Sequence, residues 1–107
     1  MAVSQSFLEY VLDQLSIIKG ITTRRMFGGV GIFHYRKIFC LLARDEVYFK
    51  VDDTNREKFL DEGSKPLQPF ENKPATILTY YSVPAYVLED ADTLVEWAEE
   101  SMAIQQK

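Results

Sequence analysis

The stretch "RRMFGGVGIF", residues 24–33, decides how the first half of the chain folds. A methionine and a phenylalanine lead into paired glycines, and apolar residues resume directly after them. A phosphate-binding loop would lead from a strand into a helix N-terminus, whose amides hold the anion. Here the glycines lead into another strand-like run and no Gly-Lys-Ser/Thr follows. The stretch therefore predicts a strand, a tight corner with positive φ at Gly28 or Gly29, and a second strand.

Further strands follow from the alternation of apolar and polar residues. The run "KIFCLLA" is almost continuously apolar, which is typical of a central strand covered on both sides. In "VYFKV", Val47, Phe49 and Val51 are expected to share one face. Two-residue turns are expected at 36–37 and 45–46. The result is a meander of three or four antiparallel strands over residues 21–27, 30–35, 37–43 and 47–51.

Helical spacing predicts a helix before the first strand. Ser6 followed by Glu9 has the spacing of a capping box, in which a hydroxyl and a carboxylate satisfy free amides at a helix start. Apolar residues then recur at every third or fourth position, and Gly20 is expected to end the helix.

Two more helices are expected after the meander. Asp52 or Asp53 is expected to cap a short helix over residues 54–62. The last helix is expected to begin after Asp90 as its cap, within residues 89–107. Its inner apolar stripe comprises Leu94, Trp97, Ala98 and Met102.

The segment between these two helices has a weaker secondary-structure signal. Residues 64–74 contain three prolines and are expected to be irregular, with a short edge strand near Phe70. A clear strand follows over residues 75–83 and ends at Pro84. The expected order is α-β-β-β-α-β-β-α. This order indicates an α+β fold, with a single antiparallel sheet packed by helices and residues 1–107 as one domain.

Composition narrows the class of protein. The chain has 107 residues, and no apolar run is long enough to cross a membrane. A single cysteine fits a reducing compartment, so we expect a cytoplasmic protein. The net charge is −4, but it is unevenly placed. Residues 21–51 carry six basic groups against two acids, whereas residues 52–107 carry five basic groups against twelve acids.

The sequence lacks the set of residues that a catalytic or metal-binding site needs. His34 is the only histidine and Cys40 the only cysteine, and two such ligands do not make a zinc site. The expected strand register does not pair them directly, and Cys40 is expected to be a small buried apolar residue. We therefore expect no enzymatic activity, no metal and no cofactor.

Three basic residues are candidates for contact with a partner or ligand. Arg24 and Arg25 are adjacent in a strand, so their side chains are expected on opposite faces, and Lys50 lies in the fourth strand. The alternative is a small-ligand or nucleic-acid binding module that uses this basic sheet edge. Aromatic residues in the sheet could stack bases, but the acidic pI of about 4.9 disfavours direct nucleic-acid binding. These aromatic residues are Phe27, Phe33, Tyr35, Tyr48 and Tyr80.

Four spaced motifs resemble the TfoX/Sxy N-terminal domain family. They are "MFGGVG" at 26–31, "VYFKVD" at 47–52, "YYSVP" at 80–84 and the helix with Leu94, Trp97 and Ala98. The motifs occur in the family's order, and the resemblance covers roughly residues 8 to 103.

The resemblance implies both a fold and a role. The implied fold is α+β, like that of YgaC and of type III secretion chaperones. Members of the family are associated with natural competence in bacteria, where they act as transcriptional co-activators alongside the cyclic-AMP receptor protein. No enzymatic activity or cofactor comes with the resemblance. We therefore expect a protein partner, with a homodimer through an exposed sheet edge as a second candidate.

Two features depart from the family's pattern. The competence regulators carry a second, C-terminal helical domain, whereas this sequence ends at Lys107, so we expect a stand-alone domain. The turn of the second hairpin, where Asp-Gly is common, reads Tyr35-Arg36-Lys37. A different hairpin geometry is therefore expected there.

Overall fold

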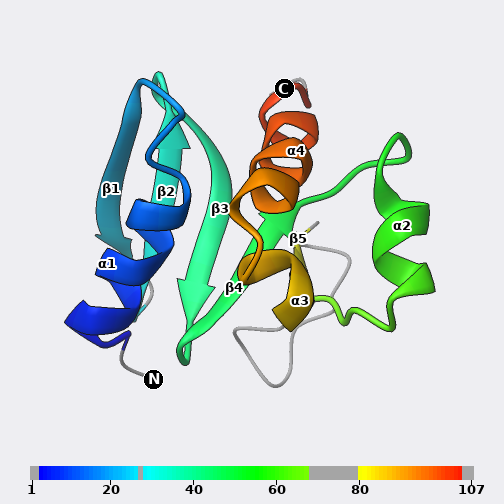
Figure 1. The fold of residues 1–107 in the computed structure, drawn as a ribbon, viewed down its shortest axis with the longest axis horizontal. Helices are drawn as coiled ribbons and strands as arrows, with labels where there is room; N and C mark the ends of the chain where they lie inside the picture. Colours follow the sequence, from blue (N-terminus) through cyan, green and yellow to red (C-terminus); the bar gives the residue numbers. More distant parts are fainter. Residues whose placement is uncertain (1–2, 27, 68–79, 105–107) are drawn as a thin grey trace.

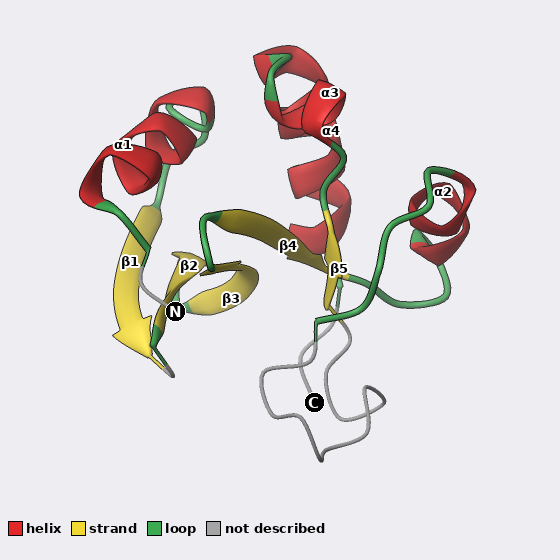
Figure 2. Ribbon diagram, turned by 90° about the horizontal axis from the view of Figure 1, so that it is seen from below, coloured by secondary structure: helices red, strands yellow, loops and turns green. Residues whose placement is uncertain are grey.

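The fold is a five-stranded antiparallel sheet with helices on one face (Figures 1 and 2). The computed structural model describes residues 3–26, 28–67 and 80–104. The strands are β1 (Ile21–Met26), β2 (Gly29–His34), β3 (Lys37–Ala43), β4 (Glu46–Lys50) and β5 (Tyr80–Ser82). The helices are α1 (Gln5–Gln14), α2 (Arg56–Asp61), α3 (Ala85–Leu88) and α4 (Ala91–Met102).

The order of strands in the sheet is the order in the sequence, β1-β2-β3-β4-β5. This confirms the α+β class, the single antiparallel sheet and the central place of β3. Four strands precede α2, which agrees with the upper number of the three or four predicted for the meander, although the expected element order counted three. Gly28 turns with φ +77° between β1 and β2, as predicted. The strand expected near Phe70 and residues 75–79 of the strand expected over 75–83 lie outside the described residues.

Both later hairpin turns lie one residue earlier than the sequence predicted. Tyr35 and Arg36 form the first turn, between the pair His34 and Lys37. Arg44 and Asp45 form the second, with Ala43 opposite Glu46. All four turn residues have positive φ, as two-residue hairpin loops require. Neither turn has the Asn-Gly pair that usually marks such a loop, so the sequence did not locate them.

Helix α1 begins at a different serine from the one predicted. Ser4, not Ser6, is the N-cap, and its Oγ accepts a hydrogen bond from the Phe7 amide at 3.2 Å. The Ser4 amide donates to the Asp45 carboxylate at 2.9 Å, which ties the start of α1 to the β3–β4 turn. The helix ends at Gln14 and not at Gly20, because irregular turns carry the chain from there to the start of β1.

Helix α2 has no aspartate cap, contrary to expectation. Asn55 occupies the N-cap position, while Asp52 accepts hydrogen bonds from the amide and hydroxyl of Thr54. The Asn55 side chain is only 3% exposed, accepts from the Asp52 amide at 2.8 Å and donates to the Lys50 carbonyl at 3.2 Å. Ser101 of α4 donates to the same carbonyl at 2.7 Å. One carbonyl at the end of β4 therefore joins the sheet to α2 and α4.

Helix α4 buries the stripe that the sequence predicted. Leu94, Trp97 and Ala98 are buried, and Met102 is half-buried. The helix spans Ala91–Met102, which is shorter than the expected 89–107, and no side-chain hydrogen bond from Asp90 caps its amides. The Asp90 carboxylate instead accepts from the Thr93 hydroxyl at 3.0 Å. The short helix α3, which directly follows Pro84, was not predicted.

The two faces of the sheet bury different amounts of apolar surface. The main core lies between the sheet and the helices and includes Val47, Phe49 and Val51, which confirms their common face. A smaller cluster of Tyr48, Leu67 and Tyr80 lies on the other face, with Leu41 and Ala43 packed against it. Strand β3 therefore contributes to both layers, as its continuous apolar run predicted.

Candidate functional site

The outer edge of β1 is the free edge of the sheet. In the described part of the chain, β1 pairs only with β2, at one end of the strand order (Figure 1). The opposite edge is covered, because residues 65–67 run along β5. The Leu67 amide donates to the Tyr80 carbonyl at 2.8 Å, and the Ser82 amide donates to the Lys65 carbonyl at 3.0 Å. A free strand edge offers unpaired amides and carbonyls to another chain.

The strand register shows which main-chain groups of β1 face outward. The Tyr35 amide donates to the Gly20 carbonyl at 3.0 Å, and Gly20 lies opposite Tyr35 in the register that begins with Ile21 opposite His34. In an antiparallel ladder, hydrogen-bonded and non-hydrogen-bonded pairs alternate. Alternate residues from Thr22 onward therefore bond to β2. The main-chain groups of Ile21, Thr23 and Arg25 point away from the sheet.

The two arginines of β1 lie on opposite faces, as predicted. Arg25 is opposite Val30, whose side chain is in the main core, so Arg25 lies on the helix side. Arg24 is opposite Gly31 and lies on the other side. Both arginines are exposed, and neither forms an ion pair with the described residues. They are therefore available to a partner that binds along this edge.

Lys50 does not join the two arginines. It lies at the end of β4, opposite Tyr80, and two strands separate it from β1. At a strand spacing of about 4.8 Å this places it roughly 14 Å from β1. Partial burial lowers the pKa of the Lys50 ammonium, and the nearby Asp52 carboxylate opposes that shift. The three candidate residues therefore do not form a single site.

A basic aromatic tip at the β2–β3 turn was missed in the sequence. The Tyr35 ring packs over Gly20, where an added Cβ would lie 2.5 Å from a ring atom. It also contacts the His34 ring edge-to-face, with a distance of 4.6 Å between the ring centroids. Tyr35 is nevertheless 65% exposed. The exposed side chains within three residues of Gly20 or Tyr35 in the sequence include those of Ile17, Lys19, Arg36 and Lys37. This tip was not predicted, because the contact between Gly20 and Tyr35 depends on a turn at Tyr35 and Arg36 that lies one residue earlier than expected.

The aromatic residues of the sheet do not form an exposed stacking platform. Tyr48 and Tyr80 are each only 7% exposed, and Phe33 is half-buried. The Tyr48 hydroxyl donates to the Glu46 carboxylate at 2.7 Å. Burial, followed by this hydrogen bond, raises the pKa of Tyr48 to about 12. Phe27 lies outside the described residues.

The groups that could perform metal or nucleophilic chemistry are dispersed. Cys40 is opposite Ile32 and His34 is opposite Lys37, so the two are not paired, as predicted. Among residues 3–26, 28–67 and 80–104, no three side chains of metal-ligand type come together. Cys40 is fully buried, and this burial raises the pKa of its thiol.

The burial of Cys40 leads to a testable prediction. We expect the native protein to react with a thiol reagent at least about 100-fold more slowly than the protein unfolded in urea, because the reactive species is the exposed thiolate. Absorbance of the released chromophore measures the rate. The unfolded chain is the internal control. Rapid reaction of the native protein would show that Cys40 is accessible and would contradict the buried position.

No helix in the described segments has the length and apolar character needed to span a membrane.

Comparison with known protein families identifies a family that agrees with the fold. No curated protein matches the sequence. The model of the TfoX N-terminal domain matches residues 13–104, which extend from within α1 to just past α4. This match covers nearly the whole sequence and contains all five strands of the sheet, so the chain belongs to the TfoX N-terminal domain family.

Proposed function

We propose that this domain is a non-enzymatic cytoplasmic interaction module that acts through protein contacts, in the manner of the competence and transcription co-regulators of its family. The observation that carries the proposal is the outer edge of β1, which pairs with no further strand among the described residues. This edge presents the outward main-chain groups of Ile21, Thr23 and Arg25 together with two exposed arginine side chains. Main-chain hydrogen bonds to an added strand give affinity, and neighbouring side chains give specificity.

The charge distribution favours a protein partner over nucleic acid. The described residues of β1 and the β2–β3 turn are basic, but the net charge is −4 and most acids lie at or beyond Asp52. Duplex DNA is strongly anionic, and its binding requires a basic surface large enough to neutralise several phosphates. Here the opposing acidic groups reduce that attraction, whereas a protein strand added to the β1 edge binds through main-chain hydrogen bonds, which do not require a particular charge on the partner.

The proposal is tested by blocking the edge without disturbing the sheet. In Thr23→Pro the proline removes an amide that points outward, so the hydrogen bonds between β1 and β2 remain. The wild-type protein and this variant serve as baits in lysate of the native host, followed by mass spectrometry. We expect the proline variant to capture at least about tenfold less of the specific partner than the wild type does, since strand addition requires that amide.

Thr23→Val is the matched control, because it retains the amide and the β-branched shape. It is expected to capture the same protein as the wild type. Circular dichroism of the three proteins verifies that each is folded. Equal capture by the proline variant would place the partner's contact elsewhere and would refute the role of the β1 edge.

The second candidate function is nucleic-acid binding through the basic tip. It is favoured by the exposed ring of Tyr35 and by three exposed basic side chains within two residues of Gly20 or Tyr35 in the sequence, those of Lys19, Arg36 and Lys37. Fluorescence anisotropy with random duplex DNA at physiological salt distinguishes the two functions. We expect no sub-micromolar affinity. Affinity in that range that strengthens at low salt would favour this second function over the first.

A further inference from the structure

The geometry of the free edge points to one particular partner. We infer that β1 pairs with β1 of a second copy of this chain, antiparallel, with a two-fold axis at Thr23. This inference rests on the proposed function and names its partner. The result would be a continuous ten-stranded sheet with the helices of both copies on the same face, because a two-fold axis perpendicular to a sheet preserves its faces.

The outward main-chain groups allow self-pairing in this register. The outward residues are the first, third and fifth of β1, so they are symmetric about Thr23. With the axis there, Thr23 is opposite its own copy, and Ile21 is opposite Arg25 of the second copy. Every outward amide and carbonyl of residues 21–25 then faces an outward group of the other strand, as an antiparallel ladder requires.

The side chains select this register from its neighbours. With the axis at Thr23, Arg24 is opposite Thr22 of the second copy, and two threonines face each other, which is a favourable cross-strand pair. An axis at Arg24 would place the two Arg24 side chains directly opposite each other, which is destabilising. An axis at Thr22 would pair only residues 21–23 within the strand and would leave Arg25 without a partner in β1.

Apart from its two arginines, β1 lacks the common protections of an edge strand against pairing. β1 has no proline, and its register with β2 is regular from Ile21 to Met26. Natural edge strands are usually blocked by prolines, by bulges or by a covering segment, as residues 65–67 cover β5. The arginines of β1 remain, and in the inferred register neither faces another arginine.

Cysteine scanning along β1 reads the register directly. Five single variants place a thiol at successive positions, while the native Cys40 stays buried. Opposite hydrogen-bonded residues have Cα atoms about 5.5 Å apart, which a disulfide can bridge. Two copies of residue 25 would be about 13 Å apart, at four residues of strand rise. The variants are Ile21→Cys, Thr22→Cys, Thr23→Cys, Arg24→Cys and Arg25→Cys.

Under mild oxidation we expect Thr23→Cys to form at least about tenfold more covalent dimer than the other four single variants, since only this residue meets its own copy. A mixture of Ile21→Cys and Arg25→Cys is expected to form the mixed dimer. Sedimentation of the unmodified protein is expected to show a dimer that strengthens with concentration. Thr23→Pro is expected to be monomeric, whereas Thr23→Val remains dimeric.

Two outcomes would overturn the inference. One is equal cross-linking at all five positions, and the other is dimerisation of Thr23→Pro at wild-type concentrations. In either case, edge-dependent capture of a different protein would leave the proposed interaction function standing. Loss of both self-pairing and edge-dependent capture would refute the inference and the proposed function together.

Discussion

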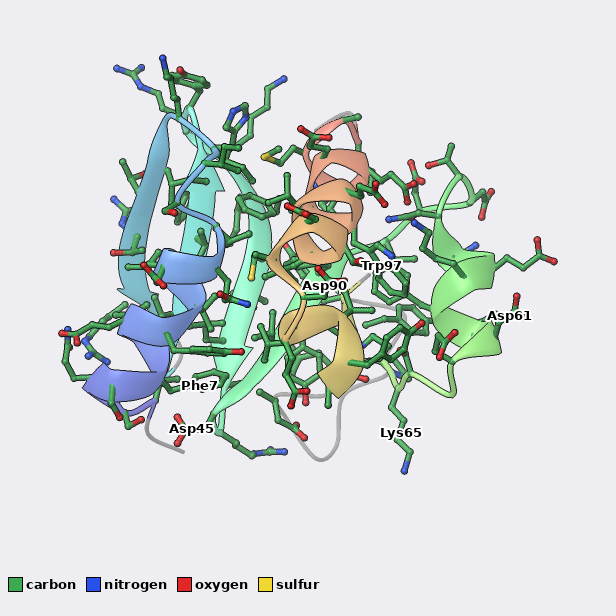
Figure 3. The ribbon with its side chains drawn as sticks, viewed as in Figure 1. Phe7, Asp45, Asp61, Lys65, Asp90 and Trp97 are labelled. Carbon is green, nitrogen blue, oxygen red and sulfur yellow. The ribbon has the colours of Figure 1, made fainter. Side chains whose placement is uncertain are left out.

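Replacement of Trp97 by alanine is expected to lower the free energy of unfolding by about 3–5 kcal/mol. The indole is only 8% exposed and lies on the side of α4 that faces α2 (Figure 3). The Phe59 ring of α2 meets it edge-to-face at a centroid distance of 4.8 Å. The Lys58 ammonium lies 4.6 Å from the indole centroid and forms an ion pair with Glu100 at 2.7 Å. Truncation therefore opens a cavity where α2 meets α4. Urea denaturation followed by circular dichroism measures the loss.

Glu96→Ala is the matched control for this helix. Glu96 directly precedes Trp97 and is exposed, so its replacement is expected to change stability by less than about 0.5 kcal/mol. If Trp97→Ala lost less than about 1 kcal/mol, the last helix would be peripheral to the core, and the packing described for α4 would be wrong.

Gly29→Ala is expected to destabilise the domain by about 3 kcal/mol. An added Cβ at this position would lie 2.2 Å from the carbonyl oxygen of Leu42 on the neighbouring strand. Since the obstacle is backbone in the centre of the sheet, β2 and β3 would have to separate locally. The family motif therefore needs this glycine for close approach of two strands. The same urea denaturation measures the effect.

The adjacent glycine provides the matched comparison. Gly28 has φ +77° and nothing within 4 Å of an added Cβ, so Gly28→Ala is expected to cost only about 1–2 kcal/mol for the left-handed conformation. The two glycines thus serve different purposes at one corner. A larger loss for Gly28→Ala than for Gly29→Ala would contradict this assignment.

Much of the sheet could be predicted because its signal is local. The alternation of Val47, Phe49 and Val51 identifies one buried face without knowledge of the rest of the chain. The continuous apolar run of β3 likewise indicates a central strand, since both of its faces need cover. The glycine pair indicates a corner between strands, because no helix start follows it.

The elements that sequence reasoning misplaced depend on partners distant in sequence. Ser4 caps α1 in a position where its own amide reaches Asp45, 41 residues away, and Ser6 offers an equally good local pattern. The hairpin turns use Tyr35 and Arg36 in a conformation that glycine and asparagine adopt more easily. The separation of Lys50 from the arginines follows from strand order, which no single motif encodes.

The sequential strand order, with helices from both ends of the fold on one face, constrains how the chain acquires its structure during synthesis. Each hairpin joins strands that are neighbours in sequence, so the meander can form from local contacts as the chain emerges from the ribosome. Helix α1 precedes the meander, but the rest of the apolar face waits for α4, whose first residue, Ala91, is translated 41 residues after Lys50 ends β4. A nascent chain of this protein therefore carries a formed but only partly covered sheet for several seconds, at ordinary elongation rates of about 5–20 residues per second. During that interval the nascent chain exposes the most apolar sheet surface to which a chaperone can bind.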